Sequence, residues 1–74
     1  MAYEYPTEAG VLRLLTIQRR WAAQFNGHLH GQWHSPDAAV IAVARHRSGL
    51  PEWDRVQADV PDDLLDWRPL GESL

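Results

Sequence analysis

Histidines and carboxylates are the residues of this chain whose types and spacing could do chemistry. His28 and His30 are separated by one residue, so on a strand both rings point to the same side and could share a Zn²⁺ ion with a third ligand from elsewhere. His34 has the same parity, but an extended strand places it about 13 Å from His30. We therefore expect solvated strand histidines, with His28 and His30 as the metal candidates and no cofactor.

The carboxylates and serines form no recognisable catalytic set. Asp62, Asp63 and Asp66 follow Pro61, and acidic residues at the start of a short helix are explained by the helix dipole. Ser35 precedes Pro36 in a helix-capping pattern, and no serine has an adjacent base at a known spacing. The sequence thus predicts that the protein is not an enzyme.

Arginine supplies every basic side chain other than histidine. The chain has 74 residues, a formal net charge of −3 and no cysteine. A net acidic balance argues against a nucleic-acid partner, although a local patch can override it. Such a patch would use five arginines on the sheet edge and the helix end: Arg13, Arg19, Arg20, Arg45 and Arg47.

The chain is organised around a hairpin that leads into a helix. Asn26-Gly27 between two apolar segments predicts the turn. A two-residue loop would split the apolar side chains between both faces, so we favour a three-residue loop, Phe25-Asn26-Gly27, with Gly27 left-handed. This register puts Trp21, Ala23, Leu29 and Trp33 on one face, and Ala22, Gln24, His28, His30 and Gln32 on the other.

The helix is expected over residues 36–48. Ser35 is the N-cap, Pro36 occupies the first helical position and Asp37 suits the positive end. Basic residues fall in the last turn, and Gly49 can adopt the left-handed C-terminal conformation.

This helix is apolar nearly all round and needs a second cover. Ala39, Val40, Val43 and Ala44 form the stripe that faces the sheet. The other apolar residues predict a surface for a protein partner or for a second copy of the chain, as exposed apolar patches mark contacts. The predicted partner-binding residues are Ile41, Trp53, Ala38 and Ala42.

Residues 11–18 fit either a strand or one side of a helix that reaches Asn26. We favour a strand, because a lone hairpin is only marginally stable and a third strand makes the unit viable. The predicted fold is α+β, a three-stranded antiparallel sheet packed on one main helix (βββα), with a short C-terminal helical turn over residues 61–67. An all-α fold is the alternative. Residues 1–74 form one domain, with 1–8 as a loose or edge-lying arm and 69–74 loosely ordered.

Eleven residues carry a resemblance to a family of small uncharacterised bacterial proteins with the pattern R-R-W-x3-F-N-G-x3-G-x-W-x-S-P-x-x-A and then P-x-x-L-x-x-W. They are turn, cap and core residues, so the resemblance implies the βββα fold and no catalytic residue. A thinner similarity, W-A-A, G-x-W and S-x-x-A-A, is to the DNA-binding modules of plant ethylene-response factors and phage integrase arms, which read DNA from the sheet face. The eleven are Trp21, Phe25, Gly27, Gly31, Trp33, Ser35, Pro36, Ala39, Pro61, Leu64 and Trp67.

The predicted function is a small interaction or structural module that self-associates, for example as a homodimer, or docks to a protein partner. A weak nucleic-acid-binding module that uses the five arginines is the alternative. The cysteine-free composition suits the reducing cytoplasm. No long apolar run or leader is evident, so we expect neither membrane insertion nor secretion.

Overall fold

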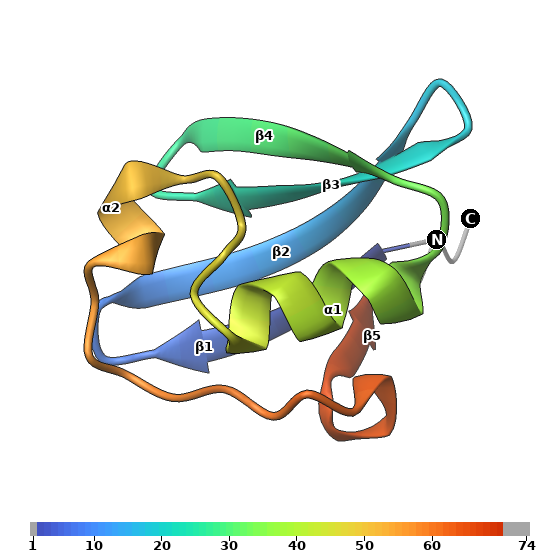
Figure 1. Cartoon of the computed structure of the whole chain (residues 1–74). Coiled ribbons are helices and arrows are strands. Elements are labelled where there is room, and N and C mark those ends of the chain that lie inside the picture. The colour runs from blue at the N-terminus through green and yellow to red at the C-terminus, as the bar shows by residue number, and fades with distance from the viewer. Residues whose placement is uncertain (1, 71–74) are drawn as a thin grey trace.

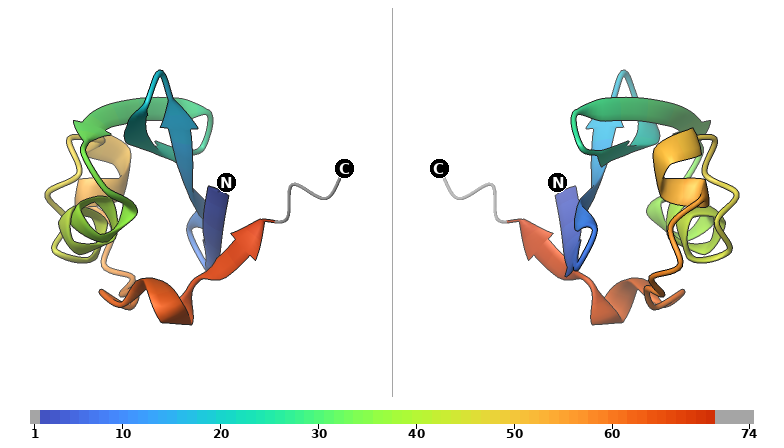
Figure 2. Two further views of the ribbon diagram at one scale, coloured as in Figure 1. Left: turned by 90° about the vertical axis from the view of Figure 1, so that its right-hand side faces the viewer. Right: turned by 90° about the vertical axis from the view of Figure 1, so that its left-hand side faces the viewer.

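A five-stranded antiparallel sheet forms one layer of the molecule, in the order β4-β3-β2-β1-β5 (Figure 1). The computed structural model describes residues 2–70. Helices α1 and α2 lie together on one side of the sheet, as the two turned views show (Figure 2). The strands are β1 (Ala2–Thr7), β2 (Gly10–Ile17), β3 (Arg20–Phe25), β4 (His28–Trp33) and β5 (Arg68–Leu70).

The α+β class is confirmed, but the prediction of three strands is wrong. Residues 10–17 form β2, as favoured, which excludes the all-α alternative. The two additional strands are β1 and β5. The expected loose arm contains β1, which lies inside the sheet because it pairs with β2 on one side and with β5 on the other. Tyr3 and Tyr5 alternate along β1 and pack against the core. Of the predicted loose C-terminal residues, Pro69 and Leu70 belong to β5, and 71–74 lie outside the described residues.

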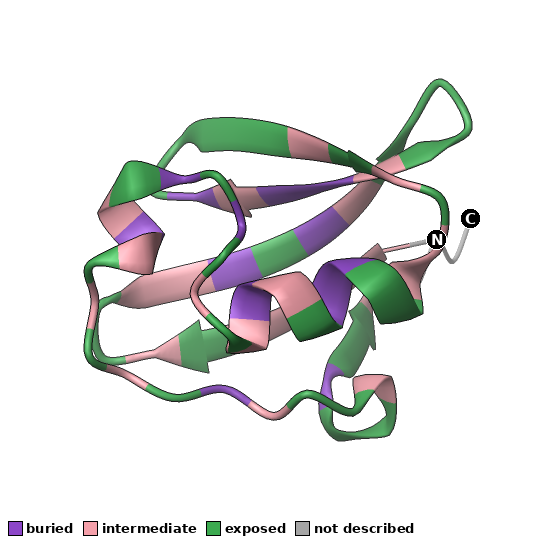
Figure 3. Ribbon diagram, viewed as in Figure 1, coloured by how far each residue is buried: buried purple, intermediate pink, exposed green. Residues whose placement is uncertain are grey.

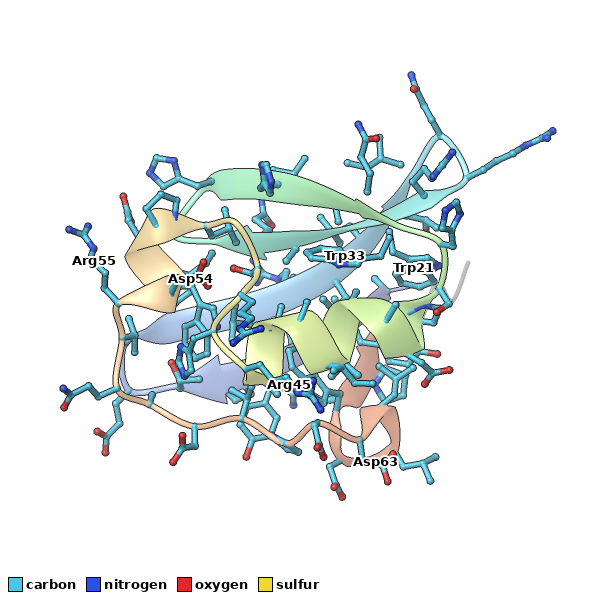
Figure 4. The ribbon with its side chains drawn as sticks, viewed as in Figure 1. Trp21, Trp33, Arg45, Asp54, Arg55 and Asp63 are labelled. Atoms are coloured by element: carbon cyan, nitrogen blue, oxygen red, sulfur yellow. The ribbon has the colours of Figure 1, made fainter. Side chains whose placement is uncertain are left out.

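The hairpin between β3 and β4 has a two-residue turn, so the predicted three-residue loop is wrong. Phe25 pairs with His28, and Asn26 and Gly27 have φ values of 51° and 84°, as a type I′ turn requires. Farther along β4 the register shifts by one residue, so that Trp33 pairs with Trp21. This bulge brings both indoles to the core side of the sheet, where they lie close together (Figure 4).

Gly31 makes the bulge possible. Its φ of 119° is in the range that favours glycine, and an added Cβ would lie only 2.1 Å from the Trp33 ring. The two-residue turn and the bulge together gather the tryptophans on one face. The same register leaves Leu29 on the opposite side of the sheet, against the prediction.

Helix α1 (Pro36–Ala44) begins as predicted and ends four residues early. The Ala38 amide donates to Ser35 Oγ at 3.1 Å, which confirms the N-cap. At the other end His46 adopts a φ of 56°. The amides of His46 and Arg47 donate to the carbonyls of Val43 and Ala42 at 3.0 and 2.9 Å, which is a Schellman motif. The left-handed residue that ends the helix is therefore His46, whereas Gly49, which also has a positive φ of 87°, lies farther along the loop.

Two short helical segments follow. The first, α2 (Pro51–Asp54), lies next to the start of β4 (Figure 1). The second, η1 (Leu64–Asp66), is a 3-10 turn inside the predicted segment 61–67, and the Asp63 carboxylate caps it by accepting from the Leu65 amide at 3.0 Å. No helix in residues 2–70 is long and apolar enough to span a membrane.

The core lies between the sheet and the helical side, where buried stretches of β2, β3 and α1 face one another (Figure 3). Trp53 of α2 is its largest fully buried side chain. The Trp53 indole N–H donates to the Val43 carbonyl at 2.8 Å, and the ring stacks on His46 with centroids 4.8 Å apart. The remaining buried members of the core cluster come from β2, β3, α1 and the C-terminal segment: Leu12, Leu14, Ala23, Phe25, Ala39, Val40, Val43, Leu50, Val60 and Trp67.

Candidate functional site

The side of the sheet that faces away from α1 is here called the outer face. No helix among the described residues covers it (Figure 2). Since Leu12 and Leu14 of β2 point to the core, the alternate residues of β2 point outward, and the strand register extends this assignment across the sheet. The outer face therefore carries Glu4, Val11, Arg13, Leu15, Ile17, Arg20, Ala22, Gln24, Leu29 and Arg68.

Three apolar side chains of the outer face surround one shallow hollow. Ile17, Ala22 and Leu29 line it, together with Arg20, and its volume is about 750 Å³. Ile17 and Leu29 are 40% and 46% exposed, whereas Ala22 is buried at its floor. Two of the large exposed hydrophobic residues in the described chain, Ile17 on β2 and Leu29 on β4, thus line the same hollow across β3, and exposed apolar groups that share one concave surface often mark a contact site.

Arginines lie on the same outer face as these apolar residues. Glu4 binds Arg68 at 2.6 Å and Arg13 at 3.5 Å, so an Arg–Glu–Arg row crosses β5, β1 and β2. Arg20 contacts the His34 ring at 3.3 Å. Of the residues assigned to the outer face by the strand register, three are arginines and only Glu4 is acidic, so the face is locally cationic on a chain with a net charge of −3.

The five arginines predicted for nucleic acid do not form one patch. Arg13 and Arg20 lie on the outer face, and Arg19 lies in the adjoining turn between β2 and β3. Arg45 and Arg47 follow the end of α1 on the other side of the sheet, where Arg45 is seen beside the helix (Figure 4). The sequence had not suggested Arg68, because its strand, β5, was not expected.

The predicted partner-binding residues are also divided. Ile41 is 40% exposed and Ala38 is exposed, while Ala42 is half-buried. Trp53 is fully buried, so it holds α2 against the core and is not available to a partner. The exposed strip on α1 is consequently one isoleucine and small alanines.

His28 and His30 both point to the helical side, against the expected outward orientation. His28 Nε2 lies 2.9 Å from Glu52 Oε1 of α2. The His30 ring lies against Gly49, where an added Cβ would come within 2.4 Å of it. Within residues 2–70 no group of three or more His, Cys, Asp or Glu side chains is placed to hold a metal ion.

Sequence reasoning missed the outer hollow because it placed Leu29 in the core and weighed Ile17 only as a strand residue. One feature of the sequence could have revealed it. Gly31 in the middle of a strand suggests a bulge, and a bulge reconciles the two-residue turn with both tryptophans on the core face.

Comparisons with protein-family models, with curated proteins and with solved structures give no match for this chain.

Proposed function

We propose that this chain is a protein-interaction module that docks to an acidic partner protein through the outer face of its sheet. The observation that carries the proposal is the hollow that Ile17, Ala22 and Leu29 line together with Arg20. Apolar anchors within a polar and arginine-containing rim are the usual composition of a protein interface. In this proposal the protein binds a partner, catalyses no reaction and uses no cofactor. Its proposed location is the cytoplasm.

Charge decides the kind of partner. The outer face has a cationic excess, since the Glu4 carboxylate is shared between two arginines, and the Arg20 guanidinium contacts the His34 ring and forms an ion pair with no carboxylate of residues 2–70. A partner surface with carboxylates around an apolar side chain complements this face.

Capture experiments with single variants test the proposal. The full chain is immobilised, and proteins bound from a cell extract are quantified for the wild type, Ile17→Asp, Ile41→Asp and Leu65→Asp. All three positions are exposed, and Leu65 of η1, which is 90% exposed, serves as the matched control. We expect one protein to be captured by the Ile41→Asp and Leu65→Asp variants in amounts at least tenfold greater than by Ile17→Asp.

Salt and a charge reversal complete this test. The same partner is expected to bind less at high ionic strength and to be lost with Arg20→Glu, because exposed charge pairs are screened. A partner that Ile17→Asp retains and Ile41→Asp loses would instead place the interface on α1. A wild-type chain that captures nothing more than Ile17→Asp contradicts the proposal.

A weak nucleic-acid-binding module is the second candidate. It is favoured by the position of Arg13, Arg20 and Arg68 with Gln24 on the same uncovered face. Fluorescence anisotropy with duplex and single-stranded DNA at low salt tests it, since non-specific binding alone gives dissociation constants of about 1–100 μM. No binding in that range excludes this candidate.

A further inference from the structure

The two edge strands of the sheet differ in how they resist pairing with another strand. β5 has three residues and contains Arg68 and Pro69, and short length, charge and proline are the devices that protect an edge. β4 has six residues and contains neither proline nor a carboxylate, lysine or arginine. A bulge interrupts it beyond His30, and Gly49 and Glu52 contact the rings of His30 and His28 on its helical side. β4 is therefore the edge that is open to strand addition.

The register shows which backbone groups of β4 are directed outward. Phe25 pairs with His28 across the two-residue turn, and Ala23 pairs with His30. In an antiparallel hairpin these are the hydrogen-bonded pairs, so the intervening residue, Leu29, directs its N–H and C=O away from β3. Leu29 is also 46% exposed.

The distribution of charge favours a second copy of the chain at this edge. The aspartates of the C-terminal segment belong to the part of the sheet away from β4: Asp62, Asp63 and Asp66 shortly precede β5 in the chain, and Asp59 lines a hollow with Tyr5, Pro6 and Thr7 of β1. Two copies that meet at β4 keep these acidic segments apart. Along β4 itself they juxtapose only uncharged residues and histidines, and the Glu52 carboxylate beside the strand lies 2.9 Å from the His28 ring, so no two strand residues of like fixed charge face each other.

We propose that two copies of this chain pair antiparallel through β4, about a two-fold axis at Leu29. Each Leu29 N–H donates to the Leu29 carbonyl of the second copy. The product is a continuous sheet of ten strands, twice the five of one chain. Both outer faces then lie on the same side and their hollows meet across the axis. This inference does not depend on the identity of the partner protein.

The bulge sets the strength of the dimer. The regular part of β4 ends before Gly31, whose φ is 119°, so strand pairing is confined to His28–Leu29–His30. Two backbone hydrogen bonds and one pair of leucines give a weak contact. We therefore expect a dimer that dissociates on dilution.

Sedimentation equilibrium over a concentration series tests the proposal, with the full chain as wild type, Leu29→Glu, Leu29→Lys and Leu65→Glu. Because the axis places residue 29 opposite itself, each Leu29 variant faces a like charge and is expected to remain monomeric. An equimolar mixture of Leu29→Glu and Leu29→Lys is expected to form a heterodimer. The Leu65→Glu control is expected to dimerise as the wild type does.

Protection of the Leu29 amide supplies a second readout. In the wild type, hydrogen exchange of this amide is expected to slow as the protein concentration rises. In the Leu29→Glu variant, exchange of the residue 29 amide is expected to be independent of concentration. A wild type that stays monomeric up to millimolar concentration overturns the proposal. So does a dimer that Leu29→Glu leaves intact, or a mixture of charged variants that fails to associate. None of these results changes the expectation that Ile17→Asp abolishes partner capture. The dimer proposal and the partner-docking proposal can therefore fail independently of each other.

Discussion

The residues at the two ends of α1 show which helix-capping conformations can be predicted from residue types alone. Ser35 and Pro36 begin α1 as their types predict. The C-terminal end was not predictable in the same way, because His46 takes the left-handed conformation that the rules assign to glycine. Stacking of the His46 ring on Trp53 supports this position, and that contact depends on a residue seven positions later in the sequence.

Asp54 illustrates a residue whose role only the folded structure reveals. Its carboxylate accepts from the Ser48 amide at 3.0 Å, from Ser48 Oγ at 2.8 Å and from the Gly49 amide at 3.1 Å. No sequence pattern distinguishes it from the other aspartates. The three hydrogen bonds anchor the loop that connects α1 to α2.

Replacement of Asp54 by alanine is therefore expected to destabilise the fold. Ser48 is 2% exposed, and loss of the acceptor leaves its donors unsatisfied, at a cost of about 2–3 kcal/mol. Thermal unfolding followed by circular dichroism is expected to show a Tm lower by about 10–20 °C. Asp62→Ala, which removes the same charge from an exposed site, is the control, and an equal effect of both substitutions contradicts the assignment.

At the scale of elements, the sequence predicted α1, β2, β3 and β4 but not β1 and β5. The tyrosines of β1 alternate as in a strand, yet six residues cannot be distinguished from an extended arm without their neighbours. β5 has only three residues, with a proline among them. Its pairing is decided by the packing of Trp67 against the core, which is a tertiary effect. The outer face escaped sequence analysis for the same reason, since it is assembled from all five strands.

The turn between β2 and β3 is a strained element. Gln18 and Arg19 have φ values of 51° and 70°, a conformation that favours glycine and asparagine. Replacing them with Asn-Gly, the dipeptide of the next hairpin, is expected to stabilise the protein by about 1 kcal/mol and to raise the Tm by about 4–8 °C.

The matched control is the reverse exchange, Asn26→Gln with Gly27→Arg, which is expected to lower the Tm. An added Cβ at Gly27 meets no atom within 4 Å, so the effect there is conformational and not steric. A Tm unchanged by both exchanges would show that turn conformation does not limit stability.

At the scale of the whole molecule, the sheet joins the two ends of the described chain. β1 lies between β2 and β5, and Glu4 of β1 is held by Arg13 and Arg68 from its two neighbours. Removal of β1 would leave β5 without a partner and expose Leu12 and Leu14 of β2.

We expect a chain without residues 1–7 to lose cooperative unfolding. If these residues formed the loose arm that the sequence suggested, their removal would leave unfolding unchanged. A domain of this size has a free energy of unfolding of only about 3–5 kcal/mol. The free energy lost on removing an interior strand is expected to exceed that value. Dispersion of amide resonances in a ¹H–¹⁵N NMR spectrum measures the outcome. A dispersed spectrum and an unchanged Tm for the shortened chain would contradict the interior position of β1.

The contact between the first and last strands has a consequence for biosynthesis. Glu4 and Arg68 are separated by 64 positions, and translation at about 5–20 residues per second takes roughly 3–13 s to cover that distance. During this interval the nascent chain holds β1 and β2 without the strand that completes the sheet. The ribosome must therefore release nearly the whole described sequence before the sheet can close.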